Sequence, residues 1–165
     1  MRRSGLILDI GSGRYPTKAD VSIDINPNSA CEVIADVHSM PFRSDSFSSV
    51  MIFQTLEHLE APSNALREIH RCLEPLGRLH CSIPNIMYYR RFVRWAFKGK
   101  TSVTTGHINA WGLPELTNLL RLTGFSLKSH TFVGTHYHRQ SRFIRLLPRI
   151  TKHNLYVLAE KQEMS

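Results

Sequence analysis

Two carboxylates and a glycine turn stand close together near the beginning of the chain. An apolar run at 6–10 contains Asp9, a Gly-Ser-Gly turn follows at 11–13, and a second apolar run ends at Asp24. Glycines let a backbone approach a ligand closely, and the N–H groups of such a turn suit an anion. A carboxylate at the end of a neighbouring strand can accept hydrogen bonds from both hydroxyls of a ribose. These residues predict a site for a nucleoside-bearing cofactor.

The spacing of these residues argues against a dinucleotide site. The dinucleotide fingerprint is G-x-G-x-x-G with an acidic residue about 20 positions further on. Here Pro16 stands at the third glycine, and Asp24 follows Gly11 by only 13 positions. A cofactor with a single nucleoside therefore fits the spacing better.

The spacing of apolar residues, and the glycine, proline, asparagine and aspartate residues that bound each run, predict the strands and helices that position these residues. Short apolar or β-rich runs predict seven strands, at 6–10, 21–24, 32–35, 50–53, 78–83, 125–133 and 155–160. Apolar residues at helical spacing predict helices over 62–73 and 114–122. Runs that are apolar without alternation are typical of a mostly parallel sheet covered on both faces. We therefore expect one α/β domain over residues 1–165, because no repeat or linker divides it.

The first crossover is unusually short. Only seven residues, 14–20, separate the glycine turn from the second strand. A βαβ crossover usually needs at least about 10–12 residues. We expect the first helix to be missing or reduced to a turn.

Composition limits the partners and the compartment. A formal net charge of +8 favours acidic partners, which include phosphates, nucleic acid and an anionic membrane surface. The cysteines Cys31, Cys72 and Cys81 include no CxxC pair, so we expect core thiols of a reducing compartment. The apolar run after the basic residues 1–5 is too short for a signal peptide, which favours a cytoplasmic protein.

Five ordered segments resemble the class I S-adenosylmethionine-dependent methyltransferases, in particular the type 11 group that includes ubiquinone and menaquinone biosynthesis enzymes. The segments are "LDIGSG", "SIDINP", "IADVHSMPFRSDSFSSVMIFQTLEHL", "ALREIHRCLEPLGRLHCSIPN" and "GHINAWGLPELTNLLRLTGF". The resemblance implies a Rossmann-like fold with a twisted, mostly parallel sheet of about seven strands and helices on both faces. It also implies S-adenosylmethionine as the cofactor. Tyr15 departs from the pattern, because it replaces the third glycine of the family's GxGxG.

The resemblance also assigns residues to parts of the cofactor. It places Asp9, Gly11, Ser12 and Gly13 around the methionine part, Asp24 on the ribose, Ile25, Asp36 and Val37 at the adenine, and Phe53, Gln54 and Thr55 at the methyl-donor end. His58 in "LEHL" would face the active site, and His107 would begin the segment that closes over the substrate. An imidazole can take up a proton near neutral pH, so either histidine could serve as a base. The simpler interpretations are turn carboxylates for both aspartates and packed or surface positions for both histidines.

The expected function is transfer of the sulfonium methyl group to an O, N or C nucleophile of a small molecule. Methylation of RNA or protein is an alternative that the positive charge favours, but no N-P-P-[FY]-like signature follows the fourth strand, where residues 53–56 read Phe-Gln-Thr-Leu. A catalytically silent cofactor-binding module is another, favoured by the missing helix. No metal is expected, because the pair His136 and His138 has no third ligand at a recognisable spacing.

Residues 85–123 are expected to form a substrate-side insertion or lid within the domain. The stretches "YYRRFVRWAFKGK" (88–100) and "HRQSRFIRLLPRITKH" (138–153) are both amphipathic and cationic at helical spacing. They are either ordinary surface helices or the frame of an entrance for an anionic or lipid-linked substrate, with peripheral contact to a membrane surface. Nucleic acid is a less favoured partner, and the sequence carries no signal for the oligomeric state.

Overall fold

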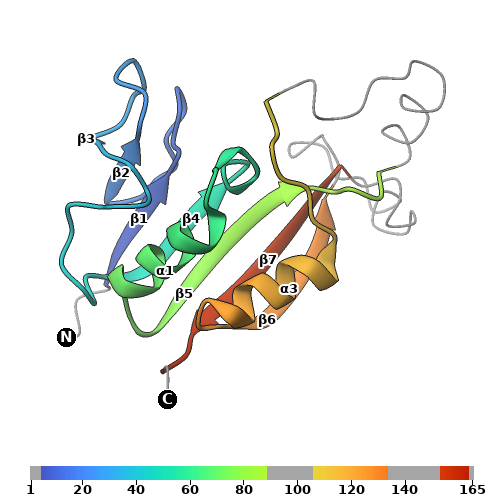
Figure 1. Ribbon diagram of the computed structural model, residues 1–165. Helices are drawn as coiled ribbons and strands as arrows, with labels where there is room; N and C mark the ends of the chain where they lie inside the picture. The colour runs from blue at the N-terminus through green and yellow to red at the C-terminus, as the bar shows by residue number, and fades with distance from the viewer. Residues whose placement is uncertain (1–4, 89–105, 134–152, 164–165) are drawn as a thin grey trace.

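The computed structural model describes residues 5–88, 106–133 and 153–163, which form one sheet with helices packed against it (Figure 1). The strands are β1 Leu6–Ile10, β2 Val21–Asp24, β3 Val33–Ile34, β4 Phe47–Phe53, β5 Leu73–Pro84, β6 Phe125–Val133 and β7 Asn154–Lys161. Their order in the sheet is β3-β2-β1-β4-β5-β7-β6. Pairing is parallel except at β7, which runs antiparallel to both of its neighbours. The predicted Rossmann-like α/β fold and all seven predicted strands are confirmed.

Two helices and a short turn complete the described elements. Helix α1 spans Pro62–Cys72, helix α3 spans Leu113–Leu122, and a 3-10 turn, η1, spans Leu56–His58. Each α-helix carries a proline in its first turn, where the missing N–H costs nothing. Helix α1 stops at Cys72 because the backbone of Leu73 is already extended and leads directly into β5.

The core lies between these helices and the sheet. Helix α1 buries Leu66 and Ile69, and helix α3 buries Leu116 and Leu120, all fully removed from solvent. The sheet meets them with every second residue of its central strands, and those residues are Val50, Ile52, Leu79, Cys81, Val157 and Ala159. The period of two in the strands and of about 3.6 in the helices therefore directs both sets of side chains to one shared layer.

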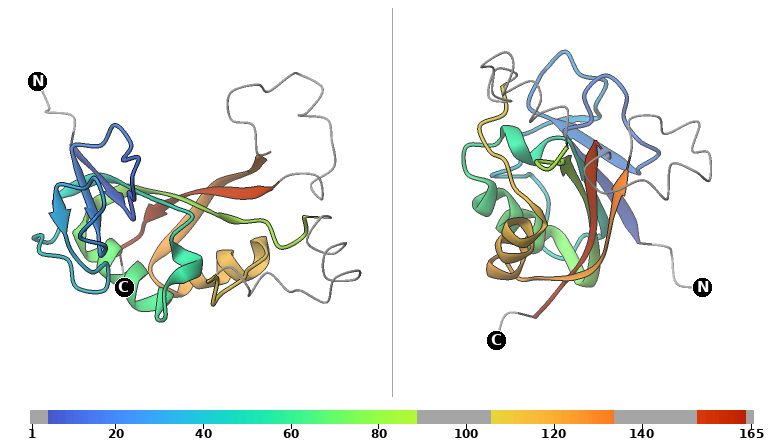
Figure 2. Two further views of the ribbon diagram at one scale, coloured as in Figure 1. Left: turned by 90° about the horizontal axis from the view of Figure 1, so that it is seen from above. Right: turned by 90° about the vertical axis from the view of Figure 1, so that its right-hand side faces the viewer.

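Both α-helices lie on the same face of the sheet, as the two views in Figure 2 show. The helices expected on both faces are thus found on one face in the part of the chain that the structure describes. The opposite face carries half-buried side chains, among them Met51, Phe53, His80 and Tyr156. The connections at 11–20, 25–32 and 35–46 contain turns but no helix, so in the described part of the chain no helix covers this face.

The shortened first crossover is confirmed as a loop. Residues 14–20 contain turns and bends, and the loop is held to β1 by side-chain carboxylates. The Thr17 N–H donates to Asp9 Oδ2 at 2.8 Å, and the Ile7 N–H donates to Asp20 Oδ2 at 2.8 Å. The Asp20 N–H returns a bond to the Ile7 carbonyl at 3.0 Å. These bonds satisfy backbone groups of the loop and of β1 without a helix.

Some expectations concern residues that the structure does not describe. The two cationic stretches lie outside the described residues, except for Tyr88 and His153, and so do His136 and His138. Among the helices of the described ranges, none combines the length and apolarity that crossing a bilayer requires.

Candidate functional site

A cavity of about 530 Å³ opens at the carboxyl ends of β1, β2 and β4. The strand order reverses between β1 and β4, and ligands of open parallel sheets bind at such a point. The volume lies in the range typical of small-molecule and cofactor sites. The predicted site residues that line the cavity are Gly11, Asp24, Ile25, Asp36, Val37, Gln54, Thr55 and His58. The structure therefore brings together eight of the residues singled out from the sequence.

Gly11 fits its position only because it has no side chain. Its φ angle is +69°, and a Cβ built there would lie 2.3 Å from Thr55 Oγ1. Gly13 has a φ angle of +58°, but a Cβ built there would meet nothing within 4 Å. Gly11 thus lets the turn after β1 approach the loop after β4 closely, whereas Gly13 is needed only for its backbone conformation.

The backbone N–H groups of this turn are already bonded within the protein. Those of Gly11 and Ser12 donate to the Ile23 carbonyl at 2.9 and 3.3 Å, and that of Gly13 donates to Asp24 Oδ2 at 2.8 Å. The expectation that they remain available to an anionic ligand is therefore wrong for this conformation. Their role is to fasten the end of β1 to the end of β2.

Asp24 links two turns at the edge of the cavity. Besides the bond from Gly13, its Oδ1 accepts the Asn26 N–H at 2.8 Å. Each carboxylate oxygen can accept more than one hydrogen bond, so the carboxylate retains acceptor capacity toward the cavity. Asp24 can therefore hold the turns and accept hydrogen bonds from a ligand, the two roles that were alternatives in the sequence.

Asp36 and His38 are hydrogen-bonded to each other on the cavity wall. Asp36 Oδ1 accepts the His38 N–H at 2.9 Å and lies 2.7 Å from His38 Nδ1. These bonds, the backbone one first, lower the pKa of Asp36. Val37, which stands between them in the sequence, is buried, and Ile25, which also lines the cavity, exposes 68% of its surface. A carboxylate beside exposed apolar surface suits a flat ring that carries an amino group.

Gln54 adopts a strained conformation at the cavity. Its φ angle is +51°, a region that residues other than glycine rarely occupy. The surrounding structure holds it there, since its N–H donates to the Ser82 carbonyl at 2.9 Å and its Nε2 to Ser82 Oγ at 3.2 Å. Such strain is concentrated at functional sites. This conformation could not be predicted from the sequence, because glutamine has no preference for it.

Five of the predicted residues lie outside the cavity lining: Asp9, Ser12, Gly13, Phe53 and His107. Asp9 is buried and holds Thr17 in the first loop. Phe53 follows Ile52, which points to the helices, so its ring lies on the other face of the sheet, 6.1 Å from the ring of Tyr156. Residues that the sequence analysis missed also line the cavity, and they are Ile10, Ile23, Ala35, His38, Leu59 and Glu60. His38 could have been found from its position two residues after Asp36.

The two candidate catalytic histidines are in contact. Their ring centroids are 4.7 Å apart at an interplanar angle of 78°. His58 Nδ1 lies 3.0 Å from the Gly106 carbonyl oxygen. Because a carbonyl can only accept, Nδ1 carries a proton, so in the neutral ring Nε2 holds the lone pair. The structure thus joins His58 and His107, which lie far apart in the sequence, into one cluster.

Backbone bonds hold this cluster together. The N–H groups of Ile108 and Asn109 both donate to the Glu57 carbonyl at 3.1 Å, and Asn109 Nδ2 donates to the Leu59 carbonyl at 2.6 Å. The loop that carries His107 is thereby fixed to η1, which carries His58. Glu57 and His107 also border a second, smaller cavity with Trp111.

Comparison with known proteins agrees with this architecture. Residues 8–81 match the family of type 11 methyltransferase domains. A segment of 47 residues is 47% identical to demethylmenaquinone methyltransferase of Chlamydia muridarum. That match covers 28% of this chain and only 20% of the relative, so it speaks for a shared segment rather than for the whole enzyme.

Solved structures match over nearly the whole chain. A SAM-dependent methyltransferase from Thermotoga maritima superposes with a TM-score of 0.73 at 20% identity, covering 98% of this chain and 84% of its own. One from Archaeoglobus fulgidus superposes with a TM-score of 0.68 at 19% identity, covering 97% and 87%. At these identities the similarity establishes the fold.

Proposed function

We propose that this chain, whose residues 8–81 match the type 11 methyltransferase domains, is a class I S-adenosylmethionine-dependent methyltransferase that transfers a methyl group to an O, N or C nucleophile of a small molecule. The observation that supports this most is the cavity at the strand ends, with Asp24 and Asp36 on its wall. The family match and the structural neighbours imply S-adenosylmethionine as the cofactor. This cofactor supplies an activated methyl group, so the protein mainly has to hold the nucleophile in line with it.

In this proposal each cavity residue contacts one part of the cofactor. Asp24 accepts hydrogen bonds from the ribose hydroxyls, and Asp36 accepts the adenine amino group, with the exposed side chain of Ile25 against the ring. Gln54 and Thr55 border the methyl-donor end. The bonds from Gly13 and Asn26 support the role of Asp24, because they fix its carboxylate before any ligand binds.

His58 is the proposed base where the acceptor must lose a proton. Its side chain lines the cavity, and its Nε2 is the acceptor nitrogen because Nδ1 donates to the Gly106 carbonyl. A neutral imidazole can take a proton from a hydroxyl or ammonium group near pH 7. His107, in ring contact with His58, is the second candidate for the same role.

For the acceptor we propose a small anionic or lipid-linked molecule. The net charge of +8 supports an anionic acceptor. The name of the relative from Chlamydia muridarum, a demethylmenaquinone methyltransferase, supports an acceptor of that kind. In a binding screen, the protein should then bind demethylated quinols more tightly than nucleic acid.

The cofactor site can be tested by calorimetric titration with S-adenosylmethionine and with its demethylated product. Replacing Asp24 by Ala should weaken binding by about 1–3 kcal/mol, or roughly 5- to 150-fold, since the ligand's hydroxyls lose their partner. Asp20→Ala is the matched control, because Asp20 also accepts a backbone N–H but lies outside the cavity. No binding by the wild type, or equal affinities for wild type and Asp24→Ala, would contradict the proposal.

A further inference from the structure

We propose that Glu57, His58 and His107 form a binding site for a divalent transition-metal ion beside the cofactor cavity. Each of the three offers one ligand atom, and these atoms all lie within 4.8 Å of one another. No metal was expected from the sequence, because Glu57 and His58 lie far from His107 along the chain. The fold creates this cluster by placing the loop at 106–111 on η1.

The geometry is close to that of a bound ion. In a tetrahedral site with bonds of about 2.0–2.1 Å, ligand atoms are about 3.3 Å apart. Closing the cluster to that size requires each pair of atoms to approach by at most about 1.5 Å. Small shifts of the exposed His58 and of the half-buried His107 toward Glu57 would supply this movement.

His58 is already oriented as a metal ligand. Histidines that bind metals usually donate the other ring N–H to a carboxylate or a backbone carbonyl, which fixes the tautomer and the direction of the ring. The bond from His58 Nδ1 to the Gly106 carbonyl, at 3.0 Å, is of this kind. It leaves Nε2 as the coordinating atom.

The set of donors indicates which ions fit. Two imidazoles and one carboxylate suit Zn²⁺, Fe²⁺ or Co²⁺, whereas Mg²⁺ and Ca²⁺ prefer sites made of oxygen. The carboxylate comes from Glu57, which is 1% exposed. Three protein ligands leave coordination positions open.

The open positions would face the substrate side of the cavity, since His58 lines that cavity. An oxygen of the methyl acceptor could bind there and be oriented by the ion. This role rests on the proposed function, but binding of the ion itself does not. For His58, metal binding and the role of a base exclude each other, because an imidazole that coordinates a metal no longer has a lone pair for a proton.

The test is titration of the metal-free full chain with Co²⁺, followed by its visible absorption bands, and with Zn²⁺, followed by calorimetry. We expect one ion per chain. His58→Ala, His107→Ala and Glu57→Gln should each weaken binding at least tenfold, since even outer-shell partners of metal ligands contribute about 10- to 100-fold. His130→Ala is the control with unchanged affinity, because His130 is exposed on β6 and outside the cluster.

Absence of saturable binding by the wild type would overturn the proposal. So would wild-type affinity in both His58→Ala and His107→Ala, which would place the ion elsewhere, for example on His136 and His138. If Glu57→Gln disturbs folding because Glu57 is buried, as judged by circular dichroism, His58→Ala still tests the site because His58 is exposed. Affinity for S-adenosylmethionine measured on the same proteins reports on the proposed function separately.

Discussion

The two halves of the sheet are held together by different forces. Around β1, β2 and β3 the connections are loops, and carboxylates bond to backbone N–H groups. Asp9, Asp20, Asp24 and Glu32 each accept such a bond at 2.8 Å. Around β5, β6 and β7 the helices α1 and α3 bury apolar side chains on the sheet (Figure 1).

This difference separates stability from binding. A fully buried leucine contributes about 1.5–3 kcal/mol, and the helical half buries many such side chains. A hydrogen bond to a charged carboxylate contributes about as much, but less where solvent screens it, as at the exposed Asp20, and the loop half has only a few such bonds. The helical half therefore supplies most of the stability. The loop half holds its backbone with few atoms and leaves the strand ends open, and the cavity lies there. Predictions for the two halves should differ accordingly.

The largest effect is expected for Leu120→Ala in α3. Leu120 is fully buried, so its truncation should lower the free energy of unfolding by about 2–5 kcal/mol through lost burial and a cavity. Ile25→Ala is the comparison in the loop half, and its stability should change by less than about 0.5 kcal/mol because Ile25 is 68% exposed. Urea denaturation measures both, and equal losses would show that the division between the halves is wrong.

The next effect separates two glycines of one turn. Gly11→Ala should cost about 2–4 kcal/mol, from the left-handed backbone and from the overlap with Thr55. Gly13→Ala should cost only about 1–2 kcal/mol, since its new methyl group meets nothing. Thermal unfolding of the two variants checks this order. A costlier Gly13→Ala would mean that the turn packs differently.

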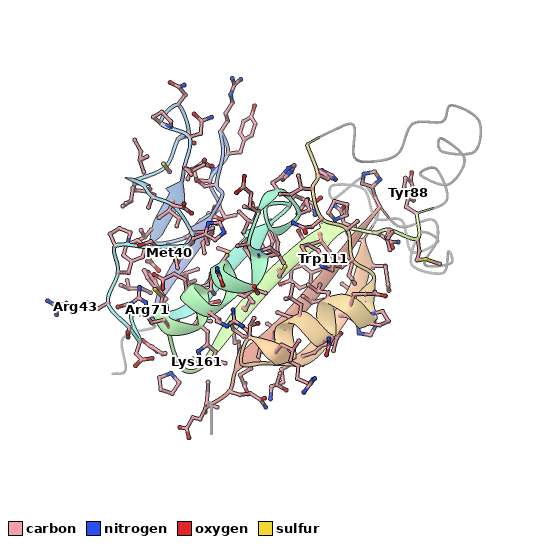
Figure 3. All side chains as sticks on the ribbon, in the orientation of Figure 1. Met40, Arg43, Arg71, Tyr88, Trp111 and Lys161 are labelled. Atoms are coloured by element: carbon pink, nitrogen blue, oxygen red, sulfur yellow. The ribbon has the colours of Figure 1, made fainter. Side chains whose placement is uncertain are left out.

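A moderate effect is expected where α1 meets the loop half. Glu68 on α1 accepts bonds from Arg71 at 2.7 and 2.8 Å and from the Met40 N–H at 2.9 Å. Figure 3 shows Arg71 near Met40, at the end of the molecule away from Trp111 and Tyr88. Glu68→Gln should cost about 1 kcal/mol at pH 7, because Arg71 is partly exposed.

The pH dependence of this contact has a definite sign. The hydrogen bonds from Arg71, and to a lesser degree the Met40 N–H, lower the pKa of Glu68 below its ordinary 4.5. Its contribution is therefore fully present above about pH 4.5 and is lost as the pH falls through the lowered value. Urea midpoints between pH 6 and pH 3 should fall more for the wild type than for Glu68→Gln. Glu60→Gln, on the exposed side of the cavity, is the control and should follow the wild type.

The smallest effect on stability is expected for Asp36→Asn. The bonds from His38 lower the pKa of Asp36, so this contact also stabilises above the ordinary pKa of 3.8 and is lost in acid. Asp36 is half exposed, and the change should cost less than about 0.5 kcal/mol at pH 7. Carboxyl titration by NMR reports the lowered pKa directly. A loss as large as that of Leu120→Ala would contradict the comparison between the halves.

The strands and helices could be predicted well because, along most of the chain, the apolar periodicity changes where turn-forming residues stand. The bounds of β1, β2 and β6 are those expected from the sequence. The missing first helix followed from a count of residues. By contrast, β4 begins at Phe47, three residues before the predicted start. The polar residues Ser48 and Ser49 interrupt the apolar run from which the start was predicted. Strand β5 begins at Leu73, although Pro75 and Gly77 are typical of a turn.

The site was predictable only where it follows from the ends of strands. Asp24 and Asp36 stand at such ends, and the structure places both on the cavity. The direction of Phe53, the strain at Gln54 and the contact of His58 with His107 depend on tertiary packing. A motif gives positions along the chain, but not the face on which a side chain lies or the loop that covers it.

The position of β7 has a consequence for how the chain is made. In the described sheet β6 pairs with β7 alone, and β7 follows it in the sequence. During translation β6 and the apolar face of α3 therefore leave the ribosome before the strand that joins them to β5. Until β7 has left the ribosome and paired, a chain that has already released α3 and β6 exposes this apolar surface. Release of β7 then closes the sheet in one late step.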